Sequence, residues 1–121
     1  MGRFEPVSEP KGKAKKMFAA LTEKMGCVPK VYALMGRNPA FMEAMMQCSQ
    51  AAGKGLDAKT KELICIAVSA ANNCQYCIDA HMAIGEKVGV SSDEAYAAIE
   101  VAAAMTAYNI FNHGADPEND F

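Results

Sequence analysis

The segment from Leu63 to Ala71, with the sequence LICIAVSAA, is apolar on nearly every side of a helix. Asp57 stands at a capping position before it, and the pair Asn72-Asn73 interrupts it, so we expect a helix from about Asp57 to Ala71. A helix that is apolar all round needs cover from neighbouring helices or from a second subunit. The segment therefore favours a closely packed helical protein that forms homo-oligomers.

Further helices are predicted on both sides of this segment, by apolar residues at helical spacing and by capping residues. We expect them over residues 13–25, over residues 30–36, from Asn38 as N-cap to Gly53 or Gly55, from Asn73 as N-cap to Gly89, and from Ser91 to about His113 before Gly114. Ser91 and Glu94 have the spacing of a capping box. No segment has a convincing strand pattern, so the predicted fold class is all-α.

The 121 residues are enough for one domain. We expect an N-terminal arm and helix over residues 1–37, a core over residues 38–114 and an acidic tail over residues 115–121. Apolar residues make up 51% of the chain and charged residues 21%, which excludes a disordered protein. The net charge of −2 gives no reason to expect a nucleic-acid partner.

The location of the protein is predicted from its apolar segments and its cysteines. No apolar run reaches the roughly 18 residues of a membrane helix, and the polar N-terminus lacks the apolar core of a signal peptide. Five cysteines, of which only two form a close pair, do not resemble the disulfide framework of a small secreted protein. We therefore expect a cytoplasmic protein without a membrane partner.

The close pair belongs to the motif C-x-x-C-x-x-x-H, formed by Cys74, Cys77 and His81. On a helix, these three side chains fall within about 60° of one another. Cys74 stands at the predicted helix start, where free amides and the helix dipole stabilise a thiolate. Two cysteines one turn apart can form a disulfide reversibly, which indicates a redox function.

Glu62 on the preceding helix is the candidate proton carrier. An antiparallel hairpin would bring this helix back along the one that carries His81, and a partly buried carboxylate suits proton transfer. Glu62, Cys77 and His81 would then form a proton relay.

Two other interpretations of the cysteine pair stay open. Cys74, Cys77 and His81 provide three zinc ligands, and Glu62, His113, water or another subunit would provide the fourth. Alternatively, the two cysteines are small buried residues without redox function. The remaining thiols, the second histidine and the methionine stripe are interpreted as structural: Cys27, Cys48, Cys65, His113, Met42, Met45 and Met46.

The spacing of Glu62, Cys74, Cys77 and His81 resembles that of the alkylhydroperoxidase D-like branch of the carboxymuconolactone decarboxylase family. The resemblance covers roughly residues 38–114 and includes LDAKTKELICIAVSAANNCQYCIDAHMAIGEKVGVSSDE. It implies an all-helical bundle that assembles as a homotrimer or homohexamer. The decarboxylases proper lack the cysteine pair, so the resemblance argues against lactone decarboxylation.

The resemblance also implies an activity and its partners. Members of this branch reduce hydroperoxides or disulfides through the two cysteines, with electrons from a lipoylated or thioredoxin-like dithiol protein and without a bound cofactor or metal. By resemblance, Cys77 is the thiol coupled to the relay of Glu62 and His81, and Cys74 exchanges with the donor. Tyr76 stands where the best-known peroxidases of the branch have a histidine. A general disulfide reductase, or a metal-binding or structural oligomer with non-cycling cysteines, is the alternative.

Overall fold

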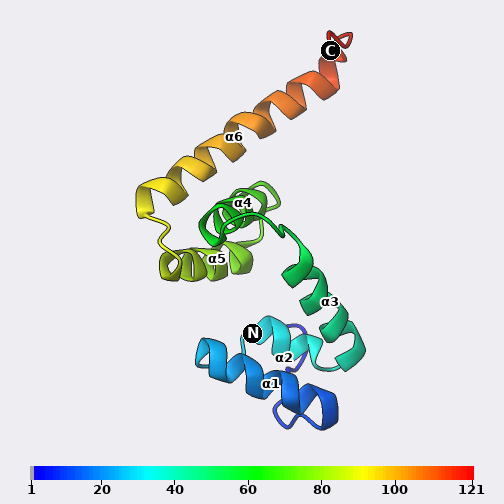
Figure 1. Ribbon diagram of the computed structural model, residues 1–121. Helices are drawn as coiled ribbons and strands as arrows, with labels where there is room; N and C mark the ends of the chain where they lie inside the picture. Colours follow the sequence, from blue (N-terminus) through cyan, green and yellow to red (C-terminus); the bar gives the residue numbers. More distant parts are fainter. Residues whose placement is uncertain (1) are drawn as a thin grey trace. The chain divides into compact units, whose positions relative to one another are not determined.

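In the computed structural model, which describes residues 2–121, the chain is all-helical, as predicted (Figure 1). The helices of these residues are α1 (Gly12–Met25), α2 (Lys30–Met35), α3 (Pro39–Ala51), α4 (Ala58–Ala71), α5 (Gln75–Lys87) and α6 (Ser92–Ala115). They form two compact units, one ending at Lys54 and the other running from Gly55 to Phe121. None of the helices in residues 2–121 is both long enough and apolar enough to cross a membrane.

The first unit contains α1, α2 and α3 around a small apolar core. This core is formed by Phe18, Leu21, Ala33 and Met42. The predicted packing role of the methionine stripe is confirmed for Met42, which is completely buried, and Met46 packs against the same cluster. The residues of the predicted site, Glu62, Cys74, Cys77 and His81, all belong to the second unit.

In the second unit, α4 packs against both α5 and α6. Ile66 of α4 and Ala95 of α6 are almost completely buried in this packing. The expected burial of α4 on several sides is wrong for the single chain, because Ile64 and Val68 remain about half exposed. Two neighbouring helices cover only part of the circumference of α4.

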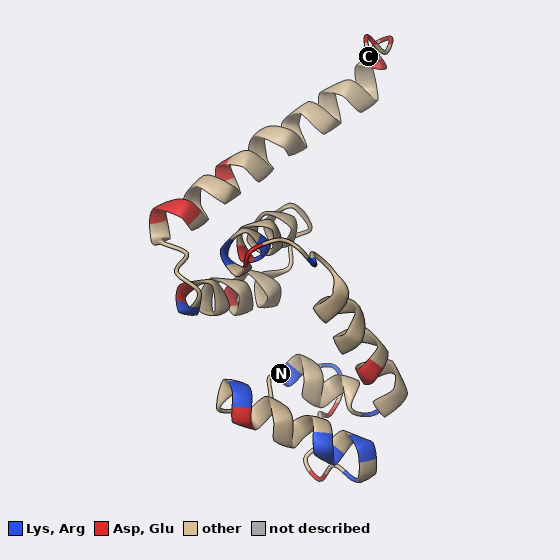
Figure 2. Cartoon of the chain, viewed as in Figure 1, with Lys and Arg blue, Asp and Glu red and all other residues tan. Residues whose placement is uncertain are grey.

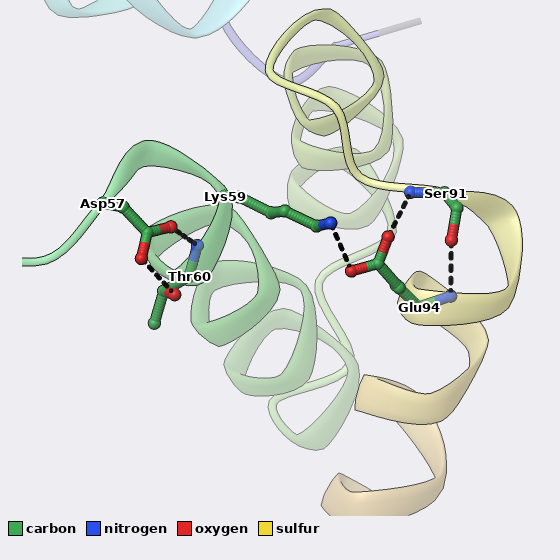
Figure 3. Close-up of polar contacts among 5 residues, drawn as sticks. All are labelled: Asp57, Lys59, Thr60, Ser91 and Glu94. Carbon is green, nitrogen blue, oxygen red and sulfur yellow. Dashed lines mark hydrogen bonds and ion pairs between the residues drawn. The ribbon is translucent and has the colours of Figure 1, made fainter.

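Capping residues fix where α4 and α6 begin (Figure 3). Asp57 accepts hydrogen bonds from the backbone N–H and the hydroxyl of Thr60, both at 2.8 Å. Ser91 and Glu94 form the predicted capping box, with both hydrogen bonds at 3.1 Å. The Glu94 carboxylate also lies 2.6 Å from the Lys59 ammonium, so one side chain caps α6 and links it to α4.

The predicted end of α6 at Gly114 is wrong, because the helix continues to Ala115. Asp116 follows in the left-handed conformation with φ of 48°, which aspartate tolerates better than most residues. A single glycine costs a helix only about 1 kcal/mol, so Gly114 does not stop it. Residues 101–115 carry no Lys, Arg, Asp or Glu, and Figure 2 shows this part of α6 without charge colours.

Candidate functional site

The turn between α4 and α5 places the first cysteine at a helix start. Asn73 adopts the left-handed conformation with φ of 58°, and the backbone N–H of Cys74 donates to the carbonyl of Ser69 at 3.0 Å. The N–H of Asn73 donates to the carbonyl of Ala70, which completes a Schellman motif that ends α4. The prediction that Asn73 caps α5 is therefore wrong, because Asn73 ends α4 and Cys74 is the N-cap.

Cys74 and Cys77 form a disulfide across the first turn of α5, with their Cα atoms 5.2 Å apart. The backbone N–H of Cys77 also donates to Cys74 Sγ at 3.3 Å, so the sulfur takes the place that an oxygen occupies in most N-caps. After reduction, the same N–H and the positive end of the helix dipole would stabilise a thiolate at Cys74. Both cysteines are partly exposed, which leaves them open to exchange.

Glu62 and His81 meet where α4 and α5 pack together. Glu62 Oε2 lies 2.7 Å from His81 Nδ1, and the side chains are 11% and 31% exposed, respectively. One hydrogen bond thus joins a nearly buried carboxylate to a half-buried imidazole that water can still reach. Such a pair can hold a proton and pass it on. Cys77 lies four residues before His81, on the same face of α5. The Glu62–His81 pair is therefore about one helical turn further along α5 than the disulfide.

Gly85 allows this close approach of the two helices. It is buried one turn after His81, and a Cβ built on it would lie 3.8 Å from Glu62 Cβ and 3.3 Å from Val90. A larger side chain at this position would force α5 away from Glu62 or displace Val90. Because glycine has no side chain, Gly85 allows Glu62 and His81 to come within hydrogen-bond distance.

Cys65 is a member of this cluster that the sequence analysis interpreted as structural. Glu62, Cys65 and His81 each offer a ligand atom, and these atoms lie within 4.8 Å of one another. Partial burial raises the pKa of the Cys65 thiol, and the negative charge of Glu62 raises it further, whereas Lys61 acts in the opposite direction. The signal in the sequence was the spacing of three between residues 62 and 65, which puts both on one face of α4.

His113, considered as a fourth zinc ligand, is exposed in the last turn of α6. Among residues 2–121, the side chains that lie close enough together to share a metal ion are Glu62, Cys65 and His81, and His113 is not one of them.

A shallow hollow lies between α4 and α6, and Asn73 of the turn that follows α4 is one of its lining residues. Its volume is about 330 Å³, and it is lined mainly by small side chains: Ala70, Ala71, Asn73, Ile99, Ala102, Ala103 and Thr106. Asn73 directly precedes Cys74 in the chain, but neither Cys74 nor Cys77 lines the hollow.

Comparison with known proteins gives a family match over residues 39–117, to the carboxymuconolactone decarboxylase family. A protein of Solibacter usitatus named alkyl hydroperoxide reductase AhpD is 36% identical over 59% of this chain and 41% of its own length. An uncharacterised protein of Haemophilus influenzae is 38% identical over 54% of this chain and 60% of its own length. The chain thus spans about two fifths to three fifths of these two relatives.

The arrangement of the helices also matches a solved structure. The crystal structure of the alkylhydroperoxidase AhpD core from Rhodospirillum rubrum has a TM-score of 0.81 and covers 98% of this chain and 96% of that chain. The sequence identity is 21%, so the likeness concerns the fold.

Proposed function

Because the chain belongs to the carboxymuconolactone decarboxylase family, we propose that it is a thiol oxidoreductase of the alkylhydroperoxidase D type. It reduces hydroperoxides or disulfides through a dithiol–disulfide cycle of Cys74 and Cys77. The observation that carries the proposal is the disulfide at the start of α5, on the helix whose His81 is paired with Glu62. A zinc site made of Cys74 and Cys77 would require both sulfurs as thiolates, whereas here they are bonded to each other.

With a hydroperoxide, the Cys77 thiolate attacks the outer oxygen of the O–O bond and becomes a sulfenic acid. The alkoxide leaving group takes a proton from the Glu62–His81 pair and departs as an alcohol. The Cys74 thiol then condenses with the sulfenic acid, which releases water and forms the disulfide. Glu62 and His81 thus donate a proton in the first step and recover one from a thiol.

The cycle closes with an external dithiol, a lipoylated or thioredoxin-like protein. One donor thiolate attacks Cys74, and the Cys77 thiolate leaves. The second donor thiol attacks the mixed disulfide, releases Cys74 and leaves the donor as a disulfide. Electrons therefore pass from the donor dithiol through Cys74 and Cys77 to the substrate, without a cofactor.

General disulfide reduction is the second candidate function. Tyr76 stands directly before Cys77, at the position where the sequence analysis noted a histidine in the best-known peroxidases of this branch. Exchange with a disulfide substrate does not require that imidazole, because it uses only the two cysteines and the Glu62–His81 pair. The thiolate then attacks a substrate sulfur instead of a peroxide oxygen.

A disulfide-mapping experiment tests both functions. Reduced protein is treated with one equivalent of an alkyl hydroperoxide or of a small disulfide, and disulfides are mapped by mass spectrometry. Formation of Cys74–Cys77 with the hydroperoxide supports peroxidase activity, and formation only with the disulfide supports the second candidate. Cys77→Ser must abolish the bond, and Cys48→Ser, which removes an exposed cysteine of the first unit, must not. If neither oxidant closes the bond, the redox proposal is wrong.

Assembly as a homotrimer or homohexamer and a cytoplasmic location complete the proposal. The exposed apolar surface of α6, which includes Val101, Tyr108 and Phe111, supports assembly because water is a poor solvent for it. The cytoplasmic location is supported by the need of a cycling dithiol for a reducing compartment.

A further inference from the structure

Three potential metal ligands converge on one point between α4 and α5. The thiol of Cys65, a carboxylate oxygen of Glu62 and a ring nitrogen of His81 lie within 4.8 Å of one another. Glu62 is nearly buried, and the other two side chains are about half-buried. The three groups come from α4 and α5, which pack directly on each other.

We propose that Glu62, Cys65 and His81 form a zinc-binding site that is separate from the cysteine pair. Sulfur, imidazole nitrogen and carboxylate oxygen are the donors that Zn²⁺ accepts, whereas Mg²⁺ and Ca²⁺ require a shell of oxygen ligands. Three protein ligands leave the fourth tetrahedral position to water. The charges of one thiolate and one carboxylate balance the charge of the ion.

Binding exchanges protons for the metal. The Cys65 thiol loses its proton to solvent when its sulfur bonds to zinc, and a proton held on the ligating nitrogen or oxygen of the Glu62–His81 pair leaves in the same way. No electron transfer is involved, so the site requires no oxidant or reductant.

The disulfide makes this site distinguishable from one formed by Cys74 and Cys77. In the oxidised protein those two sulfurs are bonded to each other and cannot bind zinc as thiolates. The remaining thiols are Cys65 and the exposed Cys27 and Cys48, which belong to the first unit. A thiolate–metal bond formed by the second unit of the oxidised protein must therefore come from Cys65.

The experiment is a metal titration of the whole 121-residue chain in its oxidised form. Zn²⁺ binding is measured by calorimetry, and Co²⁺ is used in parallel, because a thiolate-to-cobalt absorption band reports directly on a Co–S bond. We expect one ion per chain with a thiolate band. Cys65→Ser should remove the band. Loss of a residue that only hydrogen-bonds a metal ligand lowers metal affinity by roughly 10–100-fold, and loss of the ligand Cys65 should lower zinc affinity by more than that. Cys27→Ser and Cys48→Ser are the matched controls and should retain the band and the affinity.

Two further measurements keep the result interpretable. Helicity measured by circular dichroism shows whether Cys65→Ser is folded. Glu62→Gln is a second variant, which should weaken zinc binding but retain the Co–S band because Cys65 is still present. A Co–S band that survives in Cys65→Ser, or no binding by folded oxidised wild-type protein, overturns the proposal. The zinc site shares Glu62 and His81 with the proposed proton relay, so a bound ion would block the relay until it is released. Because the oxidised protein does not turn over, the result of the titration is nevertheless independent of the redox function proposed above.

Discussion

His81 Nδ1 lies 2.7 Å from Glu62 Oε2, although the two residues are nineteen positions apart in the chain. This contact crosses the interface of α4 and α5 and connects a nearly buried acid to the helix that starts with the disulfide. A carboxylate that is hydrogen-bonded to one ring nitrogen fixes the orientation of the imidazole. In the proposed mechanism, this pair holds and passes a proton, four residues after Cys77 on α5.

The first prediction concerns this pair. Glu62→Gln retains the shape of the side chain but replaces the carboxylate that is hydrogen-bonded to His81 with an amide that cannot take up a proton. We expect disulfide formation between Cys74 and Cys77 to slow by about 100-fold or more, the usual contribution of a positioned acid–base group. Stopped-flow oxidation of the reduced protein measures the rate. Glu86→Gln makes the same chemical change at an exposed position of α5, and an equal loss in both variants would exclude a specific role for Glu62.

The second prediction concerns the N-cap of α5. Under reducing conditions, Cys74→Ser retains an acceptor for the N–H of Cys77, whereas Cys74→Ala leaves it without one. We expect the serine variant to be more stable than the alanine variant by about 1 kcal/mol, measured by urea unfolding. Both variants lack the disulfide, so the comparison isolates the cap. Equal stability would mean that Cys74 contributes nothing to the helix as an N-cap.

The third prediction concerns Gly85 and the contact of α4 with α5. Gly85→Leu places a side chain against Val90 and Glu62, so we expect about 1–3 kcal/mol of destabilisation together with slower oxidation of the cysteine pair. Gly114→Leu is the matched control, since a Cβ there would meet nothing within 4 Å, and leucine suits a helix better than glycine. Thermal unfolding and stopped-flow oxidation of both variants check the prediction. Similar stability of the two variants would show that α5 does not need the glycine.

The fourth prediction concerns pH and the link between α4 and α6. The ion pair with Lys59 and the hydrogen bond from the Ser91 backbone lower the pKa of the exposed Glu94 carboxyl in the folded protein. A lowered folded-state pKa means that the stabilisation is complete above the unfolded pKa of about 4.3 and disappears as the pH falls through the folded value. Wild-type protein should therefore be more stable than Glu94→Gln at pH 7, and the difference should vanish in strong acid.

Chemical denaturation across this pH range provides the measurement for Glu94. Glu100→Gln removes an exposed carboxylate further along α6 and should show a smaller dependence on pH in the same range. A difference between wild-type protein and Glu94→Gln that stays constant down to strong acid would contradict the assignment.

The fifth prediction concerns the exposed end of α6. Tyr108 and Phe111 are 63% and 70% exposed in the single chain, on a segment without charged residues. We expect light scattering to give a mass of three or six chains. Phe111→Glu should lower that mass, because burying a new carboxylate at a subunit contact is costly. Glu118→Gln in the acidic tail is a control that should leave the mass unchanged. A wild-type mass near 12.9 kDa would contradict the prediction.

The sequence by itself determined the features that depend on neighbours within about one helical turn. Asn38, Asp57 and the pair Ser91 and Glu94 cap the helices they were predicted to cap, because a capping side chain bonds to an amide two or three residues away. The C-x-x-C spacing likewise placed Cys74 and Cys77 within disulfide distance, because both stand in one turn of the same helix.

Only the tertiary structure decided the features that depend on how helices pack. Glu62 could be proposed as a relay residue, but its hydrogen bond to His81 depends on the approach of α5 to α4 beside Gly85. Cys65 seemed structural until this packing brought it near His81 of another helix. Asn73 was assigned to the wrong helix, because asparagine suits both the start of a helix and the left-handed end of one. The residue type and the spacing alone leave these alternatives open.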